Sequence, residues 1–166
     1  ETLTGAMENH PFDANLAFAV AAQIRQESRF QHSLRWANYA LLLWPTLDGA
    51  HVEAARALAF LGKKEQAALE YRLALTTNRR TLDTIIKDLE VFRFPIAIQL
   101  QVIPPTQPNY LYVLCRSVKK AQKKEDSIFC LDKLAATPNI NPQHISDAIH
   151  SLLNYNAISN AERAMA

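Results

Sequence analysis

The stretch "LGKKEQAALEYRLAL", residues 61–75, has the pattern that decides the fold. Gly62 is followed by a charged segment and then by small and aromatic residues at helical spacing, Ala67, Tyr71 and Ala74. Glycine suits a helix C-terminus, where φ becomes positive. Small side chains let two helices cross closely, and residues three or four apart lie on one helix face. The stretch therefore predicts the end of one helix, a short link, and a second helix packed against the first.

The same pattern occurs earlier in the chain, at a spacing of about 34 residues, which is a period typical of stacked helix pairs. Ser33 corresponds to Ala67, Ala40 to Ala74, and the segment "SLRWANYALLLWP" to "AALEYRLALTTNR". Pro45 follows the earlier copy, as proline commonly follows a helix end. Because self-similarity at a fixed period is the signature of repeat architectures, the two copies predict successive helix pairs.

The period is interrupted in the middle of the chain and then returns. Small residues recur at Ser127 and Ala161, which are separated by the same interval as Ser33 and Ala67. The interval from Ala67 to Ser127 is longer than one period and shorter than two. The extra residues, 82–107, predict a helix and a short helix that form an irregular or shortened copy. Prolines mark the end of this segment, as is usual for a loop.

The pattern of apolar and turn residues gives the expected helix bounds. Asp13, Asp48 and Asn141 are expected to act as N-caps, because their side chains accept bonds from the first helical amides. We expect helices over residues 14–28, 31–44, 48–61, 65–77, 81–92, 95–102, 109–122, 126–136, 142–153 and 157–165.

The composition favours an all-α fold. Only three glycines occur among 166 residues, which leaves few sites for the tight turns of hairpins. Alanine and leucine, which favour helices, dominate the chain. The net charge of +2 is too small to indicate nucleic-acid binding. No apolar run approaches the ~18 residues of a membrane span, so none is expected.

The second copy resembles the tetratricopeptide repeat (TPR) at Ala55, Gly62, Ala67, Tyr71 and Ala74. The resemblance implies a right-handed α-solenoid of antiparallel helix pairs, four to five in number, with an irregular middle pair. Residues 1–13 are then expected to be a leader or the remnant of a tag. The rest would be a single repeat domain, 14–166, divided into copies at 14–47, 48–81, 82–107 (irregular), 108–141 and 142–166 (partial).

The resemblance also implies a partner-binding groove, because the first helix of each TPR pair lines a concave face. The positions that fall there bear basic, amide and aromatic groups but no carboxylate. Such a surface favours an acidic peptide or an anionic polymer, since Arg and Lys pair with carboxylates or phosphates. The predicted groove residues are Asn15, Phe18, Arg25, Arg56, Phe60, Asn109, Tyr112, Arg116 and Lys119.

No motif indicates an enzyme, and no cofactor or metal is expected. The chain has neither a glycine-rich phosphate loop nor a G-x-S-x-G or HExxH motif. His144 and His150 are six residues apart and fall on different helix faces. Cys115 and Cys130 lie in the two helices of one copy. Either a disulfide in an oxidising compartment or two buried thiols would suit them, and the sequence favours the thiols.

Three hypotheses for function follow. The leading one is a non-catalytic interaction scaffold that binds a peptide or protein segment, with an acidic segment as the candidate that the charges favour. The segment at residues 33–75 also resembles, more weakly, the soluble helical-repeat regions of bacterial O-antigen ligase- and polymerase-type membrane proteins. This resemblance implies an accessory domain of an envelope polysaccharide enzyme. If the chain is part of such an envelope protein, we expect it in the periplasm. If it is not, we expect it in the cytoplasm. The third hypothesis is self-association through the final helix, at Ile158, Ala161 and Met165.

Overall fold

The computed structural model describes residues 3–120, 124–147 and 150. The chain divides into two compact units, Glu1–Val102 (unit 1) and Ile103–Ala166 (unit 2). The described residues are helical, with turns and no strand, so the predicted all-α class is confirmed. The predicted helix over 157–165 and the self-association residues Ile158, Ala161 and Met165 lie outside the described residues.

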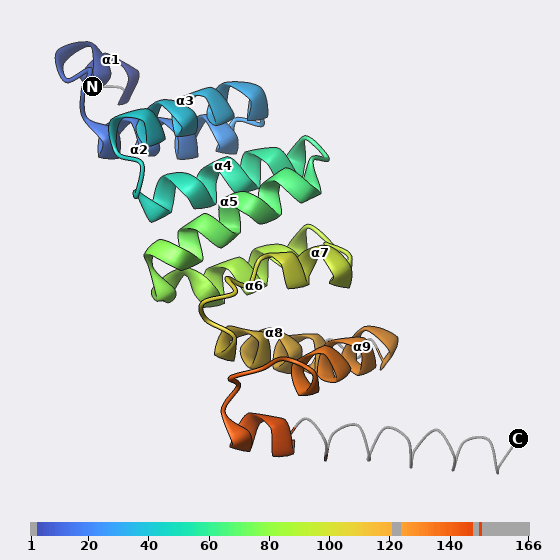
Figure 1. Ribbon diagram of the computed structural model, residues 1–166. Helices are drawn as coiled ribbons and strands as arrows, with labels where there is room; N and C mark the ends of the chain where they lie inside the picture. Colours follow the sequence, from blue (N-terminus) through green and yellow to red (C-terminus); the bar gives the residue numbers. More distant parts are fainter. Residues whose placement is uncertain (1–2, 121–123, 148–149, 151–166) are drawn as a thin grey trace, which may run out of the picture. The chain divides into compact units, whose positions relative to one another are not determined.

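Unit 1 is built from helices that follow one another in space as they do in the sequence (Figure 1). Helices α2 and α3 pack together, as do α4 and α5, while α7 packs against α5. The bounds are α1 (Leu3–Asn9), α2 (Ala14–Gln26), α3 (Phe30–Leu43), α4 (Asp48–Phe60), α5 (Lys64–Thr77), the 3₁₀-helix η1 (Arg79–Thr81), α6 (Leu82–Val91) and α7 (Ile96–Gln101).

The small residues of the repeated pattern lie where helices cross, as predicted. Ser33, Ala40, Ala67 and Ala74 are all fully buried. The Ser33 hydroxyl donates to the Ala21 carbonyl at 2.9 Å across the α2–α3 pair, which satisfies a polar group that burial would otherwise leave unpaired. Close packing between α2 and α3 therefore depends on side chains no larger than a methyl or hydroxymethyl group.

The same turn joins helices at three places in unit 1. Ser28, Gly62 and Arg93 have φ of 61°, 77° and 51°. Each donates its amide to the carbonyl three residues back, and the next amide bonds to the carbonyl five residues before it. These bonds are those of a helix C-terminal cap with one left-handed residue. The sequence predicted this ending only at Gly62, because the other two copies use serine and arginine.

The caps agree with the sequence at two of three positions. Asp13 caps α2 by accepting from the amides of Asn15 and Leu16, and Asn141 accepts from the amide of Gln143. The prediction for Asp48 was wrong, because α4 begins at Asp48 itself after Leu47. The Asp48 carboxylate accepts instead from the side-chain amide of Asn78 at 2.9 Å.

Helix α1 was not among the predicted helices. It lies within residues 1–13, which were expected to be a leader or tag remnant, although Leu3, Ala6 and Met7 have the three- and four-residue spacing of one helix face. Its Met7 is buried in a core cluster with Ala17 and Val20 of α2. The apolar side chain of Met7 thus connects this segment to the core of unit 1.

Unit 2 contains α8 (Asn109–Lys120), α9 (Lys124–Ala135) and a further helical stretch over 142–147. A disulfide links Cys115 of α8 to Cys130 of α9, whose Cα atoms are 5.4 Å apart. The two free thiols that the sequence favoured are therefore replaced by a covalent bond. Both cysteines are fully buried, because the two helices present them to each other.

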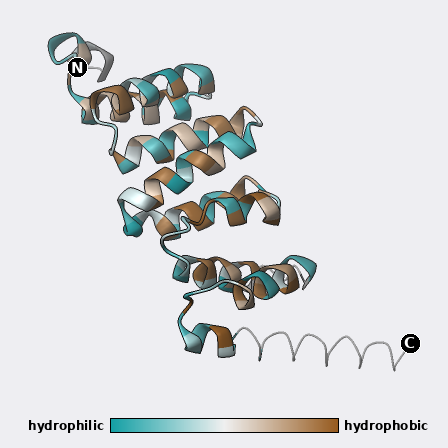
Figure 2. Cartoon of the chain, in the orientation of Figure 1, coloured by the Kyte–Doolittle hydropathy of each residue, from teal (hydrophilic) through white to brown (hydrophobic). Residues whose placement is uncertain are grey.

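Hydrophilic and hydrophobic residues alternate along the helices (Figure 2). A helix with this pattern packs one side inward while the other meets solvent, whereas the central helix α4 is buried on most of its surface. Among the described residues, no helix combines the length and apolar character that a membrane crossing requires.

Candidate interaction surfaces

The first two predicted groove residues lie near the start of α2. Asn15 is exposed and Phe18 is half-buried. Phe18 packs over Gly49 of α4, where an added Cβ would come within 3.2 Å of the ring. A larger residue at position 49 would displace the phenylalanine, so Gly49 provides the space that Phe18 occupies.

The two predicted arginines of unit 1 already have partners. Glu53 lies between them, accepting from Arg25 Nε at 2.6 Å and from Arg56 Nη1 at 2.6 Å. Arg56 Nε also donates to Asp88 at 2.8 Å. The expectation of a surface without carboxylates was therefore wrong here, because Glu53 and Asp88 come from helix positions that the repeat analogy did not assign to the groove. We call Arg25, Glu53, Arg56 and Asp88 the charge network.

Tyr71 of α5 completes this arrangement. Its buried hydroxyl donates to the Asp88 carboxylate at 3.1 Å. Burial, together with the nearby Asp88 charge, raises the pKa of Tyr71 far above its ordinary value. Burial lowers the pKa of Arg56, but the hydrogen bonds and charges of Asp88 and Glu53 raise it by more, so the net shift is upward. The guanidinium of Arg56 is therefore charged at neutral pH.

The charge network connects helices from successive parts of unit 1. It takes one residue from α2, two from α4 and one from α6. Its two guanidinium groups are balanced by two carboxylates, and Glu53 is only 4% exposed at its side chain. A satisfied network of this kind has little capacity left for an acidic partner. It holds the helices together instead.

Phe60, at the end of α4, is 47% exposed and lies between two other phenylalanines. Its ring stacks on Phe30 with centroids 4.2 Å apart and planes at 8°. It meets Phe92 edge-on at 4.9 Å. We call Phe30, Phe60 and Phe92 the aromatic cluster. The three rings lie at the three turns with the left-handed residue, which face the same side of unit 1 in Figure 1.

Basic residues lie close in sequence to each member of the aromatic cluster. Arg29, Lys63 and Arg93, here called the basic rim, are exposed. Arg29 directly precedes Phe30, Lys63 follows Phe60 by three residues, and Arg93 directly follows Phe92. Glu27 pairs with Arg29 at 3.5 Å, with both side chains about half-exposed, a geometry that contributes little. The turn side of unit 1 thus combines an exposed aromatic surface with positive charge.

Phe30 and Phe92 were not among the predicted groove residues. Phe30 opens a second helix, where the repeat analogy places no groove residue, and Phe92 lies in the segment interpreted as irregular. A simpler signal was present, since phenylalanine recurs at positions 30, 60 and 92 close to the turns.

Unit 2 holds the other four predicted groove residues. The Tyr112 ring stacks on His144, with centroids 4.0 Å apart, and its hydroxyl donates to Asp147 at 3.1 Å. Burial and the Asp147 contact raise the pKa of Tyr112. Asn109 Oδ1 accepts from the amide of Asn141, and Arg116 is exposed. Lys119 belongs to α8, but its side chain lies outside what the structure describes.

No known family emerges from comparison: no family model and no curated protein matches this chain. Among the described residues, no three His, Cys, Asp or Glu side chains gather as a metal-binding group.

Proposed function

We propose that this chain is a non-catalytic interaction scaffold of the TPR-like solenoid type. Its partner is a protein segment with aromatic or aliphatic side chains next to Asp or Glu, which binds over the aromatic cluster and the basic rim. The observation that carries the proposal is Phe60, a large apolar side chain left 47% exposed at the centre of three contacting rings.

Aromatic side chains suit this role because they bury a large area at low entropic cost and are frequent hot spots of binding. The ring of Phe60 is held by Phe30 on one face and Phe92 at the edge. It is therefore preorganised, and little rotamer freedom remains to be lost when a partner binds. Exposed Arg29, Lys63 and Arg93 supply attraction for carboxylates.

The location differs from the groove implied by the TPR resemblance. Arg25 and Arg56 are engaged by Glu53 and Asp88, so pairing them with a partner carboxylate would first require breaking bonds that are largely buried. In the basic rim, Lys63 and Arg93 are exposed, and the ion pair of Arg29 with Glu27 is about half-exposed, so a partner carboxylate would not have to break a buried bond there. Charge therefore favours the turn side for an acidic segment.

The test is selection of binders from a displayed library of random short peptides against the whole chain. We expect the enriched peptides to combine Asp or Glu with Phe, Leu or Trp. Phe60→Ala should weaken the best of them by about 30-fold, the effect of losing a hot spot worth ~2 kcal/mol.

The matched control is Phe129→Ala, because Phe129 of α9 is also 47% exposed but lies in unit 2. It should leave the affinity within a factor of about two, a change under about 0.5 kcal/mol. Equal losses for the two variants, or selected peptides without acidic residues, would contradict the proposal.

The disulfide favours a second candidate function. A buried Cys115–Cys130 bond is typical of oxidising compartments such as the bacterial periplasm. This supports the accessory-domain hypothesis, in which the chain serves an envelope polysaccharide ligase or polymerase. The test is to lyse the cells that naturally make the protein in acid, which stops thiol exchange, and then to count the cysteines of the protein that an alkylating reagent can label. Two alkylated cysteines per chain would count against this candidate.

A further inference from the structure

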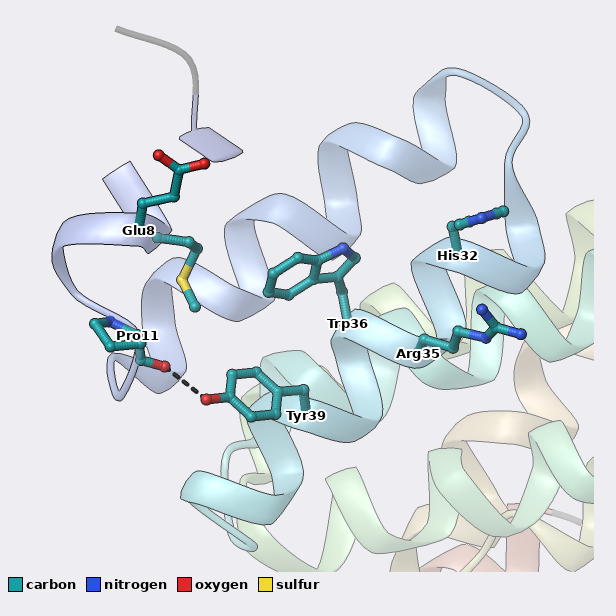
Figure 3. A pocket seen from close by; sticks show the side chains of 7 residues that line it. Glu8, Pro11, His32, Arg35, Trp36 and Tyr39 are labelled. Atoms are coloured by element: carbon teal, nitrogen blue, oxygen red, sulfur yellow. Dashed lines mark hydrogen bonds between the residues drawn. The ribbon is translucent and has the colours of Figure 1, made fainter. Parts of the chain in front are cut away.

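A pocket of about 600 Å³ lies between α1 and α3 in unit 1 (Figure 3), and none of its lining residues belongs to the aromatic cluster. Its volume lies within the range of about 300–1,000 Å³ that is usual for small-molecule sites. Met7, Pro11, Trp36 and Tyr39 give it apolar walls, and Glu8, His32 and Arg35 supply the charged and polar groups.

The walls of the pocket are held in place by contacts within unit 1. His32, Arg35, Trp36 and Tyr39 follow one another at spacings of three, one and three, which places them along one face of α3. The Tyr39 hydroxyl donates to the Pro11 carbonyl at 2.8 Å (Figure 3). The Tyr39 ring meets Trp36 edge-on, with centroids 6.0 Å apart. The indole therefore presents a fixed flat surface.

The charges of the pocket are separated. In Figure 3, His32 and Arg35 lie on one side of Trp36, and the Glu8 carboxylate lies on the other, pointing away from the indole. Among the residues that the structure describes, the side chains of His32 and Arg35 make no hydrogen bond or ion pair. Arg35 thus differs from Arg25 and Arg56, whose guanidinium groups are satisfied by carboxylates.

We propose that this pocket binds a small aromatic carboxylate. The aromatic ring of the ligand packs on the Trp36 indole beside Met7 and Tyr39, and its carboxylate accepts hydrogen bonds from Arg35 and His32. Guanidinium is suited to this role because its donors match the two oxygens of a carboxylate. The site is independent of the aromatic cluster and of the peptide partner proposed above.

The experiment follows the indole N–H signals by NMR while 3-phenylpropanoate is added to the whole chain. The chain has two tryptophans, and Trp44→Phe assigns their signals. We expect a saturable shift of the Trp36 signal and little change at Trp44, whose indole N–H is bonded to Thr46. Two further compounds separate the contributions of charge and ring: 3-phenylpropanamide lacks the charge, and acetate lacks the ring. Each should bind at least about tenfold more weakly than 3-phenylpropanoate.

Arg35→Gln should weaken 3-phenylpropanoate binding by about tenfold, and His32→Gln, at a second exposed position, should weaken it to a smaller degree. Arg79→Gln, an exposed arginine on η1, is the matched control and should have no effect. The proposal is overturned if the Trp36 signal does not move at millimolar probe, if the neutral amide binds as tightly, or if both pocket variants bind like the control.

Discussion

Arg56 and Phe60 stand one turn apart on α4, yet their surroundings differ. Arg56 belongs to the charge network, in which Glu53 and Asp88 engage its guanidinium at 2.6 and 2.8 Å. Phe60 belongs to the aromatic cluster, where about half of its side chain remains open to solvent. The first region uses its charges to hold three helices together, whereas the second leaves both apolar surface and positive charge exposed. Availability to a partner therefore depends on what a residue already contacts.

The strongest test of this contrast is Glu53→Gln. Removing the buried carboxylate leaves Arg25 and Arg56 without their shared partner, so we expect the free energy of unfolding to fall by about 3–5 kcal/mol. Both tryptophans lie in unit 1, so fluorescence-detected urea unfolding reports on it. Glu27→Gln, which removes only an exposed pair with Arg29, should cost less than about 1 kcal/mol. Similar losses for the two variants would refute the stabilising role of the network.

The disulfide extends the comparison to unit 2, where a covalent bond takes the place of a charge network between helices. Replacing Cys115 and Cys130 by alanine should lower stability by about 3 kcal/mol, the value expected for a loop of about 15 residues. Hydrogen exchange of the α8 and α9 amides measures this locally. Unchanged protection would show that the bond adds nothing to the stability of unit 2.

The turns beside the aromatic cluster offer a smaller effect. Gly62 has a φ of 77° with open space around it, so Gly62→Ala should cost about 1–2 kcal/mol from backbone strain alone. At the equivalent turn, Ser28→Gly should have the opposite sign, because it relieves that strain. Thermal unfolding of the two variants measures both. Shifts of the same sign would disprove the equivalence of the turns.

The smallest expected effect concerns His51, whose Nδ1 lies 2.7 Å from Glu70 and whose Nε2 lies 3.0 Å from the Pro45 carbonyl. Burial opposes protonation, but these contacts outweigh it and raise the pKa of His51. Because the folded pKa is the higher one, the contribution of His51 is complete below the unfolded value of about 6.5 and is lost as pH rises through the folded value.

His51→Gln should therefore lower the melting temperature more at about pH 6 than at about pH 8.5. The measurement is the difference in melting temperature between the two proteins at each pH. A difference that grows with pH would contradict the stated direction of the shift.

The helices and their close crossings could be predicted because they depend on local patterns. Serine at position 33 and alanine at position 67 indicate the packing directly, since both side chains are fully buried and small residues allow helices to cross closely. The partners of the arginines could not be predicted in the same way. Arg25 and Glu53 are 28 residues apart, and Arg56 and Asp88 are 32 apart, so their meeting depends on how whole helices rotate and stack.

The disulfide and the turn at Arg93 could not be predicted from the sequence for similar reasons. Joining Cys115 to Cys130 requires the rotation of α8 and α9 to be known to within a fraction of a turn. The turn at Arg93 follows the turn at Gly62 at a shorter interval than the one between Ser28 and Gly62, and it has no glycine. The third turn therefore does not fit a fixed period of 34 residues.

The most direct test of the account compares how Phe60→Ala and Arg25→Gln bind one peptide selected on the unmodified chain, each measured at equal concentration of folded protein. We expect a loss of about 30-fold for Phe60→Ala and less than about threefold for Arg25→Gln, that is ~2 kcal/mol against less than ~0.7 kcal/mol. A large loss for Arg25→Gln with little change for Phe60→Ala would place the partner on the charge network and contradict the account.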